Sequence, residues 1–485
     1  MLPFVQTAIQ KRVDDFHAHE RVEFDFHRVS VASAKNDRLK RAIDNAVLRS
    51  DRGRSLKLLE LPDSNRLRDL AGEIKQHTLD YLDYYLEQTA KNVEARGGHV
   101  HLASTGAEAK RIILDICHKA NVRNVIKSKS MASEEIELAH VMEAAGLNVV
   151  ETDLGEFIVQ IDHDKPSHIV TPIIHKDKES IAELFSQYFG TPYNCDPKYL
   201  TKQARVYLRD VFRKADLGMT GGNFVVAETG DICCVENEGN VRQSMTTPRV
   251  LISLIGLEKL VPRMADLAVM LKLLARSATG QSMTVYSSVF SGVRKPGETD
   301  GPEEFHLVLM DNGRTDILAS EEYREMLRCI RCGACLNACP IYRKIGGHSY
   351  GSVYPGPIGA LLTPMFQGLG EYKDLPNASS LCGACYEACP VKINIPKHLI
   401  SLRRDIVTRK ISNPIERLVY RVWAWTYMAT WRYKLVSFGQ KVTLRLQAGK
   451  SKWLKRLPPP GGGWTQVRDM PVPAAKTFRE MWGDA

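Results

Sequence analysis

CIRCGACLNACP at residues 329–340 and CGACYEACP at residues 382–390 are the two stretches that decide the organisation of this chain. The first has the spacing C-x-x-C-x-x-C-x-x-x-C-P, and the second has C-x-x-C-x-x-x-C-P. Such runs ligate cubane iron–sulfur clusters in two-cluster ferredoxins, where three closely spaced thiolates bind one cluster and the next cysteine binds the other. The spacing therefore predicts one cluster held by Cys329, Cys332, Cys335 and Cys389, and a second held by Cys339, Cys382 and Cys385.

The second ligand set is one cysteine short, because Ser379 stands where a symmetric pair of motifs would have a cysteine. The fourth iron could bind Ser379, water or another residue, or it could be absent, which would leave a [3Fe-4S] cluster. Zinc is the alternative metal, but zinc sites usually pair two C-x-x-C elements, or cysteine with histidine, around one tetrahedral ion. Cysteines at steps of three, followed by one at a step of four, favour iron–sulfur, and we expect two [4Fe-4S] clusters.

The composition is that of a soluble globular protein in a reducing compartment. The chain has 485 residues, enough for two or three domains, and is 44% hydrophobic and 25% charged. Seven of its 11 cysteines lie in the two runs, and free thiols and iron ligands persist where the environment is reducing. The N-terminal sequence has no signal-peptide pattern, and no stretch approaches about 20 uninterrupted apolar residues. We therefore expect a cytoplasmic protein.

The patterns along the chain divide it into four segments. Residues 1–95 have apolar side chains at helical spacing, which predicts a helical segment that packs onto the later parts of the chain. Residues 96–312 alternate strands with helices, which predicts an α/β domain with a mainly parallel sheet. Residues 313–400 place both cysteine runs among helices, which favours an all-α ferredoxin domain with two clusters. Residues 401–485 form a basic, helical, tryptophan-rich C-terminal region.

Two local predictions concern the α/β domain. NFVVAET and DICCVEN, at residues 223–229 and 231–237, are expected to be two strands joined by a tight turn at Thr229-Gly230. SHIVTPII, at residues 167–174, is expected to be a further strand of the alternating series.

Polar side chains at strand ends make a candidate anion or substrate site in the α/β domain. Thr105 lies where a strand meets a helix N-terminus, whose N–H groups bind anions, although threonine there is also a good N-cap. Lys127 and Lys129 follow the next strand, and open parallel sheets bind ligands at the carboxyl ends of their strands. Glu228, with Thr220 nearby, could be a base or nucleophile, or simply a turn residue. Solvated loop lysines are the alternative, and no catalytic residue can be assigned.

The last segment carries the net charge of +10. Between residues 401 and 460, fourteen Lys and Arg outnumber two acidic residues, so the rest of the chain is close to neutral. This concentration argues against a nucleic-acid-binding surface spread over the protein. All six tryptophans also lie in the last 85 residues. The region could lie on an anionic membrane, dock a partner protein, or pack over its own domain.

Five stretches carry a family likeness: CIRCGACLNACPIY, HSYGSVYPGPIGALLTP, LCGACYEACPVKI, VIKSKSM and NFVVAETG. They resemble the lactate-utilisation iron–sulfur protein B family, and the likeness covers essentially the whole chain from about residue 60 onward. The resemblance implies an α/β domain similar to the phosphosugar-isomerase and CoA-transferase-like fold, followed by a helical ferredoxin. It also implies the ligand division given above, with the three-cysteine second set as the family's own pattern.

The same resemblance implies electron transfer during the oxidation of L-lactate to pyruvate, within a complex that includes a cysteine-rich protein A and a protein C. Two adjacent redox centres also favour an electron-transfer protein over a catalyst. One alternative is an enzyme in its own right, which would bind lactate or another carboxylate at Lys127, Lys129, Thr220 and Glu228. Another is a redox-sensing scaffold. We expect the complex in the cytoplasm or at the inner face of the membrane, and no binding to nucleic acid.

Overall fold

The structure, a computed structural model, describes residues 24–457, 461–466 and 468–483. Its contacts divide it into two compact units, one that ends at Asp405 and one that begins at Ile406. The first unit contains both sheets of the α/β region and both cysteine runs, and the second is the basic C-terminal region.

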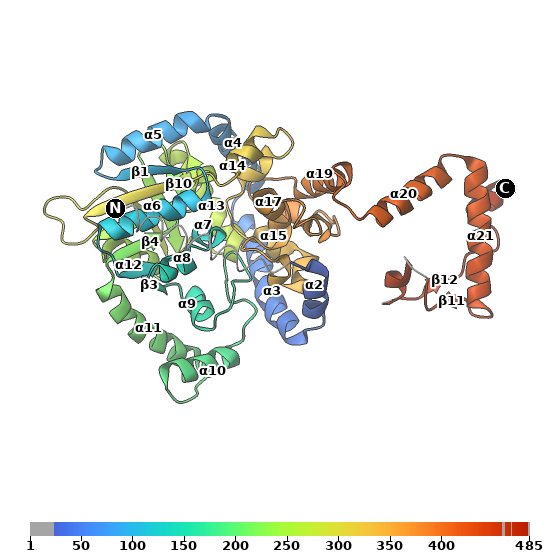
Figure 1. The fold of residues 1–485 in the computed structure, drawn as a ribbon, viewed down its shortest axis with the longest axis horizontal. Helices are drawn as coiled ribbons and strands as arrows, with labels where there is room; N and C mark the ends of the chain where they lie inside the picture. The colour runs from blue at the N-terminus through green and yellow to red at the C-terminus, as the bar shows by residue number, and fades with distance from the viewer. Residues whose placement is uncertain (1–23, 458–460, 467, 484–485) are drawn as a thin grey trace. The chain divides into compact units, whose positions relative to one another are not determined.

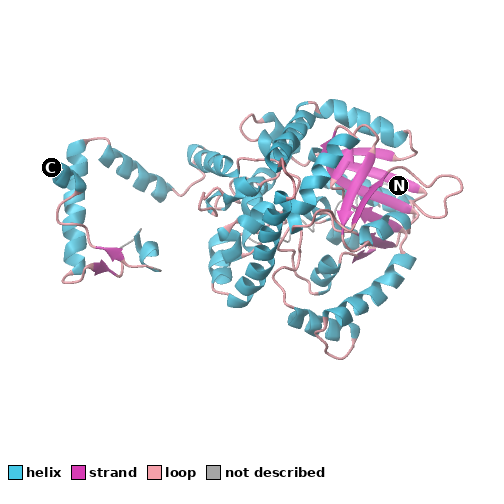
Figure 2. Cartoon of the chain, turned by 180° about the vertical axis from the view of Figure 1, so that it is seen from behind, coloured by secondary structure: helices cyan, strands magenta, loops and turns pink. Residues whose placement is uncertain are grey.

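A six-stranded sheet is the centre of the α/β region (Figures 1 and 2). All its neighbouring strands pair in parallel, which confirms the predicted mainly parallel sheet. In spatial order, the strands are β1 (His99–Ala103), β10 (Glu304–Met310), β7 (Val250–Gly256), β4 (Leu217–Thr220), β2 (Asn124–Lys127) and β3 (Asn148–Glu151).

Helices cover both faces of this sheet, as right-handed βαβ crossovers require. There is one hydrophobic core on each face of the sheet, and the residues of β7 alternate between the two. Ile252 and Leu254 pack with α6 and α8 on one face. Leu251 and Ile255 pack with α5 and α12 on the other. A third core lies between β2, β3 and helices α9 to α11. The helices of the region are α5 (Leu82–Glu94), α6 (Gly106–Lys119), α7 (Met131–Glu135), α8 (Leu138–Ala144), α9 (Leu154–Ile161), α10 (Lys178–Phe189), α11 (Pro197–Lys214), α12 (Asn240–Thr246) and α13 (Met264–Thr279).

A second sheet of four strands joins the α/β region to the cysteine-rich segment. Its antiparallel hairpin turns at Thr229-Gly230, where Gly230 has φ +73°, and this confirms the predicted hairpin. In spatial order, the strands are β8 (Leu260–Val261), β5 (Phe224–Val226), β6 (Asp231–Glu236) and β9 (Tyr286–Phe290).

The prediction of a strand at residues 167–174 is wrong, since this segment is a loop. Pro172 cannot donate a ladder hydrogen bond. The backbone N–H groups of Val170 and Thr171 donate instead to Nδ1 of His168, each at 3.0 Å. The backbone of this segment is therefore hydrogen-bonded to the side chain of His168 and not to a neighbouring strand.

The largest core of the first unit is shared by the N-terminal helices, α13, the second sheet and the cysteine-rich segment. Within this core, Ile43 and Val47 of α3 and Ala71 of α4 are fully buried. The N-terminal helices are α2 (Phe26–Ala34), α3 (Asp37–Leu59) and α4 (Ser64–Asp80). Residues 24–95 therefore pack onto the later parts of the chain, and residues 1–23 of the predicted helical segment lie outside the described residues.

The cysteine-rich segment is helical, and its described residues between 313 and 405 contain no strand. This confirms the all-α ferredoxin-like region. Its elements are α14 (Arg314–Ala319), η2 (Arg324–Arg328), α15 (Ala334–Ala338), α16 (Pro340–Ile345), η3 (His348–Tyr350), α17 (Gly356–Gln367), η4 (Leu375–Asn377), α18 (Ala384–Ala388) and α19 (Ile395–Thr408).

The second unit has two longer helices and a minimal strand pair. Trp423, Trp425 and Trp431 are each more than half exposed. No helix within the described residues is long and apolar enough to cross a membrane. The elements are α20 (Pro414–Tyr427), α21 (Thr430–Ala448), β11 (Trp453–Leu454), η5 (Gly461–Gln466), β12 (Met470–Pro471) and α22 (Phe478–Gly483).

Candidate iron–sulfur site and the cavity beside it

The two cysteine runs fold into the same local structure. In each run a glycine with positive φ precedes a one-turn helix that carries a cysteine. Gly333, at +74°, precedes α15 with Cys335, and Gly383, at +85°, precedes α18 with Cys385. Each helix ends at the cysteine before proline, where the backbone becomes extended at Cys339 and Cys389. Glycine permits the left-handed turn and proline prevents continuation of the helix. The repeat of sequence is therefore also a repeat of structure.

Six of the seven cysteines are buried, and none of the seven is in a disulfide. Burial raises the pKa of Cys332 and Cys385, the latter to about 12. Backbone N–H groups point at three of the sulfurs: Arg331 N lies 3.4 Å from Cys329 Sγ, Tyr342 N 3.5 Å from Cys339 Sγ, and Ile393 N 3.3 Å from Cys389 Sγ. Such N–H groups stabilise negative charge on sulfur, which is what a cluster-bound thiolate carries.

The electrostatic neighbours of Cys335 and Cys385 describe two groups of thiols that meet at Cys385. After burial, the groups that raise the pKa of Cys335 are Cys329, Cys332, Cys385 and Cys389. The neighbours of Cys385 are Cys339 and Cys382. Crowded buried thiols that disfavour one another's ionisation suit a metal centre, because bound iron compensates the charge of several thiolates at once. The donor set therefore fits iron–sulfur clusters.

Cys382 is the exposed member of the second group. Hydrogen bonds from the backbone of Ala384 and the side chain of Ser380 lower the pKa of its thiol. The hydroxyl of Ser379 accepts a hydrogen bond from Leu381 N at 3.1 Å, so this serine also has a local role in the turn before the motif. The second group is thus the one nearer to solvent.

The structure does not bring the five candidate anion-site or substrate-site residues together. Thr105 is an N-cap, because its Oγ1 accepts a hydrogen bond from Glu108 N at 3.2 Å. Exposed Glu228 accepts a hydrogen bond from Met264 N at 3.0 Å and so caps α13. Thr220 is buried, with its hydroxyl 2.8 Å from that of Ser253.

The two lysines of the candidate site have different surroundings. Lys127 is fully buried, and its Nζ lies 2.5 Å from a carboxylate oxygen of Glu134 and pairs also with Glu151. Lys129 donates to the carbonyl oxygen of Val170 at 3.0 Å and lines a cavity. Of these five candidate residues, Lys129 is the one that borders this cavity.

The cavity has a volume of about 280 Å³ and lies between the parallel sheet and the first cysteine run. Residues 128–132, 221–223 and 254–256 form part of its wall, at the carboxyl ends of β2, β4 and β7. Arg331 and Cys332 of the first run also line it. Ligands of open parallel sheets bind at this edge.

A buried charge network forms the side of the cavity near the first run. Glu258 lies 2.5 Å from Nε of Arg314 and 3.1 Å from Nη2 of Arg331. Arg314 also pairs with Glu135 at 2.8 Å. Although burial alone would raise it, the pKa of Glu258 is lowered to about 2 by the two guanidinium groups. Sequence patterns missed this network, because its members come from four distant segments and belong to no local motif.

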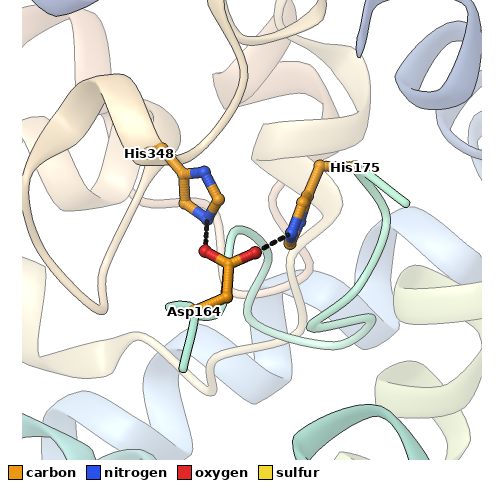
Figure 3. Close-up of side chains that lie close together, drawn as sticks. All are labelled: Asp164, His175 and His348. Atoms are coloured by element: carbon orange, nitrogen blue, oxygen red, sulfur yellow. Dashed lines mark hydrogen bonds and ion pairs between the residues drawn. The ribbon is translucent and has the colours of Figure 1, made fainter. Parts of the chain in front are cut away.

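Asp164, His175 and His348 make a second polar cluster (Figure 3). His175 Nε2 lies 2.9 Å from the Asp164 carboxylate, and His348 Nε2 donates to the carbonyl oxygen of Lys165 at 2.6 Å. The ammonium group of Lys176 lies 2.9 Å from the same carboxylate and supplies the positive charge that a metal ion would bring. These hydrogen bonds therefore connect a loop of the α/β region to η3.

Three family models match successive parts of the chain: a LUD domain at residues 86–310, a 4Fe-4S dicluster domain at residues 325–393, and the C-terminal domain of lactate utilisation protein B at residues 408–485. The cysteine-rich segment is therefore an iron–sulfur domain of the 4Fe-4S dicluster type.

Curated relatives match along nearly the whole chain. Proteins named lactate utilization protein B share 46% identity in Bacillus licheniformis, over 93% of this chain and 94% of the relative, and 44% in Geobacillus sp. (strain WCH70), over 97% and 98%. The protein of that name from Bacillus subtilis (strain 168) is 44% identical over 93% of this chain and 96% of its own. Among solved structures, a DUF162 family protein from Deinococcus radiodurans covers 47% of this chain and 98% of that one, at 14% identity and a TM-score of 0.28.

Proposed function

Because the chain belongs to the lactate utilisation protein B family, we propose that it transfers electrons during the oxidation of L-lactate to pyruvate. When bound, the two clusters supply one-electron redox chemistry. The observation that carries the proposal is that α15 and α18, which carry Cys335 and Cys385, pack against each other, so that two groups of thiols lie side by side with six of the seven cysteines buried. A pair of neighbouring redox centres suits conduction between a donor and an acceptor.

The proposed ligands follow from the same arrangement. Cys329, Cys332, Cys335 and Cys389 would hold the first cluster. Cys339, Cys382 and Cys385 would hold the second, whose fourth iron would have a non-cysteine ligand or be absent. Backbone N–H groups that point at Cys329 and Cys389 would stabilise the thiolates of the first set, and the exposure of Cys382 supports electron exchange with a partner through the second set.

We place the protein in a complex with the lactate-utilisation proteins A and C or equivalent subunits, in the cytoplasm or at the inner face of the membrane. The basic, aromatic second unit supports a docking role, because Trp, Tyr and Arg dominate the energetically important positions of protein interfaces. The alternative is that the same region binds to an anionic membrane surface.

The test is tagged purification from lactate-grown cells under anaerobic conditions, with iron and flavin assayed on the complex and on the isolated chain. We expect the complex to pass electrons from L-lactate to a dye, and the isolated chain not to be reduced by L-lactate. The Cys385→Ser chain should assemble into the complex normally, but the rate of dye reduction by that complex should fall more than tenfold. Cys195→Ser, which changes a cysteine outside both runs, should retain it.

Reduction of the isolated chain by L-lactate would replace the electron-transfer proposal with an enzyme in its own right. Full dye reduction by a Cys385→Ser complex would show that electrons do not pass through the second set.

A further inference from the structure

Three histidines meet on one face of the parallel sheet, toward the amino ends of β1 and β10. His99 and His101 are two residues apart on β1 and so point to the same side, and His306 of β10 pairs in register with His99. The ring of His306 stacks on that of His99, with centroids 5.0 Å apart, and its Nδ1 lies 3.1 Å from Nε2 of His101. The cavity and the cysteine runs lie elsewhere, the cavity at the carboxyl ends of the strands.

The second ring nitrogen of His306, Nε2, has no hydrogen-bond partner among the described residues, although the side chain is buried. The carboxylate of Glu304 lies 3.6 Å from this nitrogen, which is too long for a hydrogen bond. Burial, followed by the imidazoles of His101 and His99, lowers the pKa of His306 to about 4 despite the opposing effect of Glu304, so the ring is neutral at pH 7. A buried polar atom without a partner is costly, so Nε2 needs one.

The contact with His101 shows what kind of partner Nε2 can take. When Nδ1 of His306 donates to Nε2 of His101, Nε2 of His306 presents a lone pair toward Glu304. Burial, followed by His99 and Lys119, lowers the pKa of His101, so a neutral ring is available to accept this hydrogen bond. A lone pair and a carboxylate that face each other repel unless a cation lies between them. Metal-bound imidazoles have this arrangement, with the other ring N–H donated to a fixed neighbour.

The spacing of the ligand atoms suits a zinc ion. Two ligands of a tetrahedral zinc ion, each about 2.0–2.2 Å from the metal, are about 3.3–3.6 Å from each other. The distance between Nε2 of His306 and the carboxylate of Glu304, 3.6 Å, is at the upper end of this range. His99 is exposed and already lies against His306, so rotation of its side chain brings a third ligand to the same place. Imidazole favours zinc-like metals, whereas Mg²⁺ and Ca²⁺ prefer oxygen ligands alone.

We propose that His306, Glu304 and His99 bind a divalent transition-metal ion of the zinc class, with His101 as the hydrogen-bonded residue that orients His306. The ion connects β1, the edge strand of the parallel sheet, to its neighbour β10. Exposed Glu304 and His99 make the site accessible from solvent, and three protein ligands leave the fourth position for water. The site is independent of the proposed electron transfer, because the cysteines take no part in it.

The test is isothermal titration calorimetry of Zn²⁺ into the anaerobically purified, untagged full chain, freed of loosely bound metal on a chelating resin. Iron content is measured before and after, so that displacement of cluster iron is detected. We expect saturable binding of one Zn²⁺ per chain that is weakened at least tenfold in His306→Gln, Glu304→Gln and His99→Gln, and no saturable binding of Mg²⁺. His348→Gln, which changes the separate polar cluster with Asp164, is the matched control and should bind Zn²⁺ as wild type does.

The orienting role of His101 has its own test. His101→Leu removes the acceptor for Nδ1 of His306 and should weaken Zn²⁺ binding at least threefold, whereas His101→Gln keeps an acceptor and should restore it. Equal binding by the two variants would contradict this role.

Hydrogen exchange followed by mass spectrometry locates the bound ion. Zn²⁺ should slow exchange in residues 97–103 and 304–310 of the wild-type chain, because the ion holds the edge strand to its neighbour, and should not do so in Glu304→Gln. Because Glu304 and His99 are exposed, their variants test the site even if His306→Gln fails to fold. No saturable Zn²⁺ binding, unchanged binding in Glu304→Gln, or loss of binding in His348→Gln would overturn the proposal.

Discussion

At the scale of single residues, His168 connects a loop of the α/β region to the first cysteine run. Its Nδ1 accepts two backbone hydrogen bonds, so Nε2 carries the proton and donates to Oδ1 of Asn337 at 3.2 Å. Asn337 lies in α15 between Cys335 and Cys339. Burial, with a smaller contribution from the charge on Lys129, lowers the pKa of His168 to about 3. The ring is therefore held neutral in a position where both nitrogens are used.

This predicts an acid sensitivity. Below a pH of about 6.5 the unfolded chain takes up a proton on His168, but the folded chain does not until about pH 3, so stability falls as pH decreases through this window. The loss is at most about 1.4 kcal/mol per pH unit. His168→Gln should be less stable than wild type at pH 7.5, and the difference should shrink by about 1 kcal/mol at pH 5.5. Anaerobic urea unfolding at both pH values measures it.

Exposed His118→Gln is the matched control, and it should leave the pH dependence of unfolding as in wild type. A difference between wild type and His168→Gln that stays constant from pH 7.5 to 5.5 would show that His168 is not held neutral in the fold.

At the scale of elements, α4 binds the end of α18. Buried Arg68 of α4 donates from Nη2 to the carbonyl oxygens of Glu387 at 2.7 Å and Cys389 at 2.9 Å, and from Nε to that of Cys389 at 3.2 Å. These are terminal carbonyl groups of a helix, which otherwise have no intrahelical partner. An N-terminal helix therefore closes the second cysteine run from more than 300 residues away in sequence.

Arg68→Ala should destabilise the protein by about 2–3 kcal/mol, because hydrogen bonds to charged groups contribute about 1.5–3 kcal/mol and the carbonyl groups are left buried. It should also speed the loss of iron to a chelator, measured by absorbance near 400 nm. Arg66→Ala removes an exposed arginine two residues earlier on the same helix and should do neither. Iron loss at the same rate in both variants would contradict a role of α4 in holding the second run.

Sequence alone is informative where a short pattern dictates a local structure. The tight turn at Thr229-Gly230 and the helical setting of the cysteine runs are predicted from such patterns, and both are found. The hydrophobic run of β7 is buried on both faces, as its composition predicts. The loop at residues 167–174 has the apolar composition of a strand, and nothing in that composition shows that the imidazole of His168 binds the backbone.

The cavity could not be predicted for a different physical reason. Arg331 occupies a spacer position within a cysteine run, and Lys259 follows a strand, so neither residue belongs to a recognisable binding motif. Their proximity depends on the packing of the cysteine-rich segment against the edge of the sheet. The candidate residues Thr105, Lys127 and Glu228 instead serve as caps or in a buried ion pair, which are common roles for such residues at strand ends.

At the scale of the whole molecule, the core around the cysteines ends before the second unit begins. Leu399 and Leu402 of α19 are the last buried members of that core. A chain that stops after Ser412 should therefore keep both clusters, with iron content and EPR signals within about a fifth of the full chain. It should lose its partners in co-purification if the second unit is the docking surface. Loss of iron on truncation would contradict the separation of the two units.

The EPR spectrum of the dithionite-reduced, anaerobically purified full chain is the decisive test of whether the seven cysteines hold two adjacent clusters. Because α15 and α18, which carry Cys335 and Cys385, pack against each other, we predict two paramagnetic centres whose signals are broadened by mutual spin coupling, with about seven or eight iron atoms per chain. A single unbroadened signal, or a silent spectrum with zinc bound in place of iron, would contradict it.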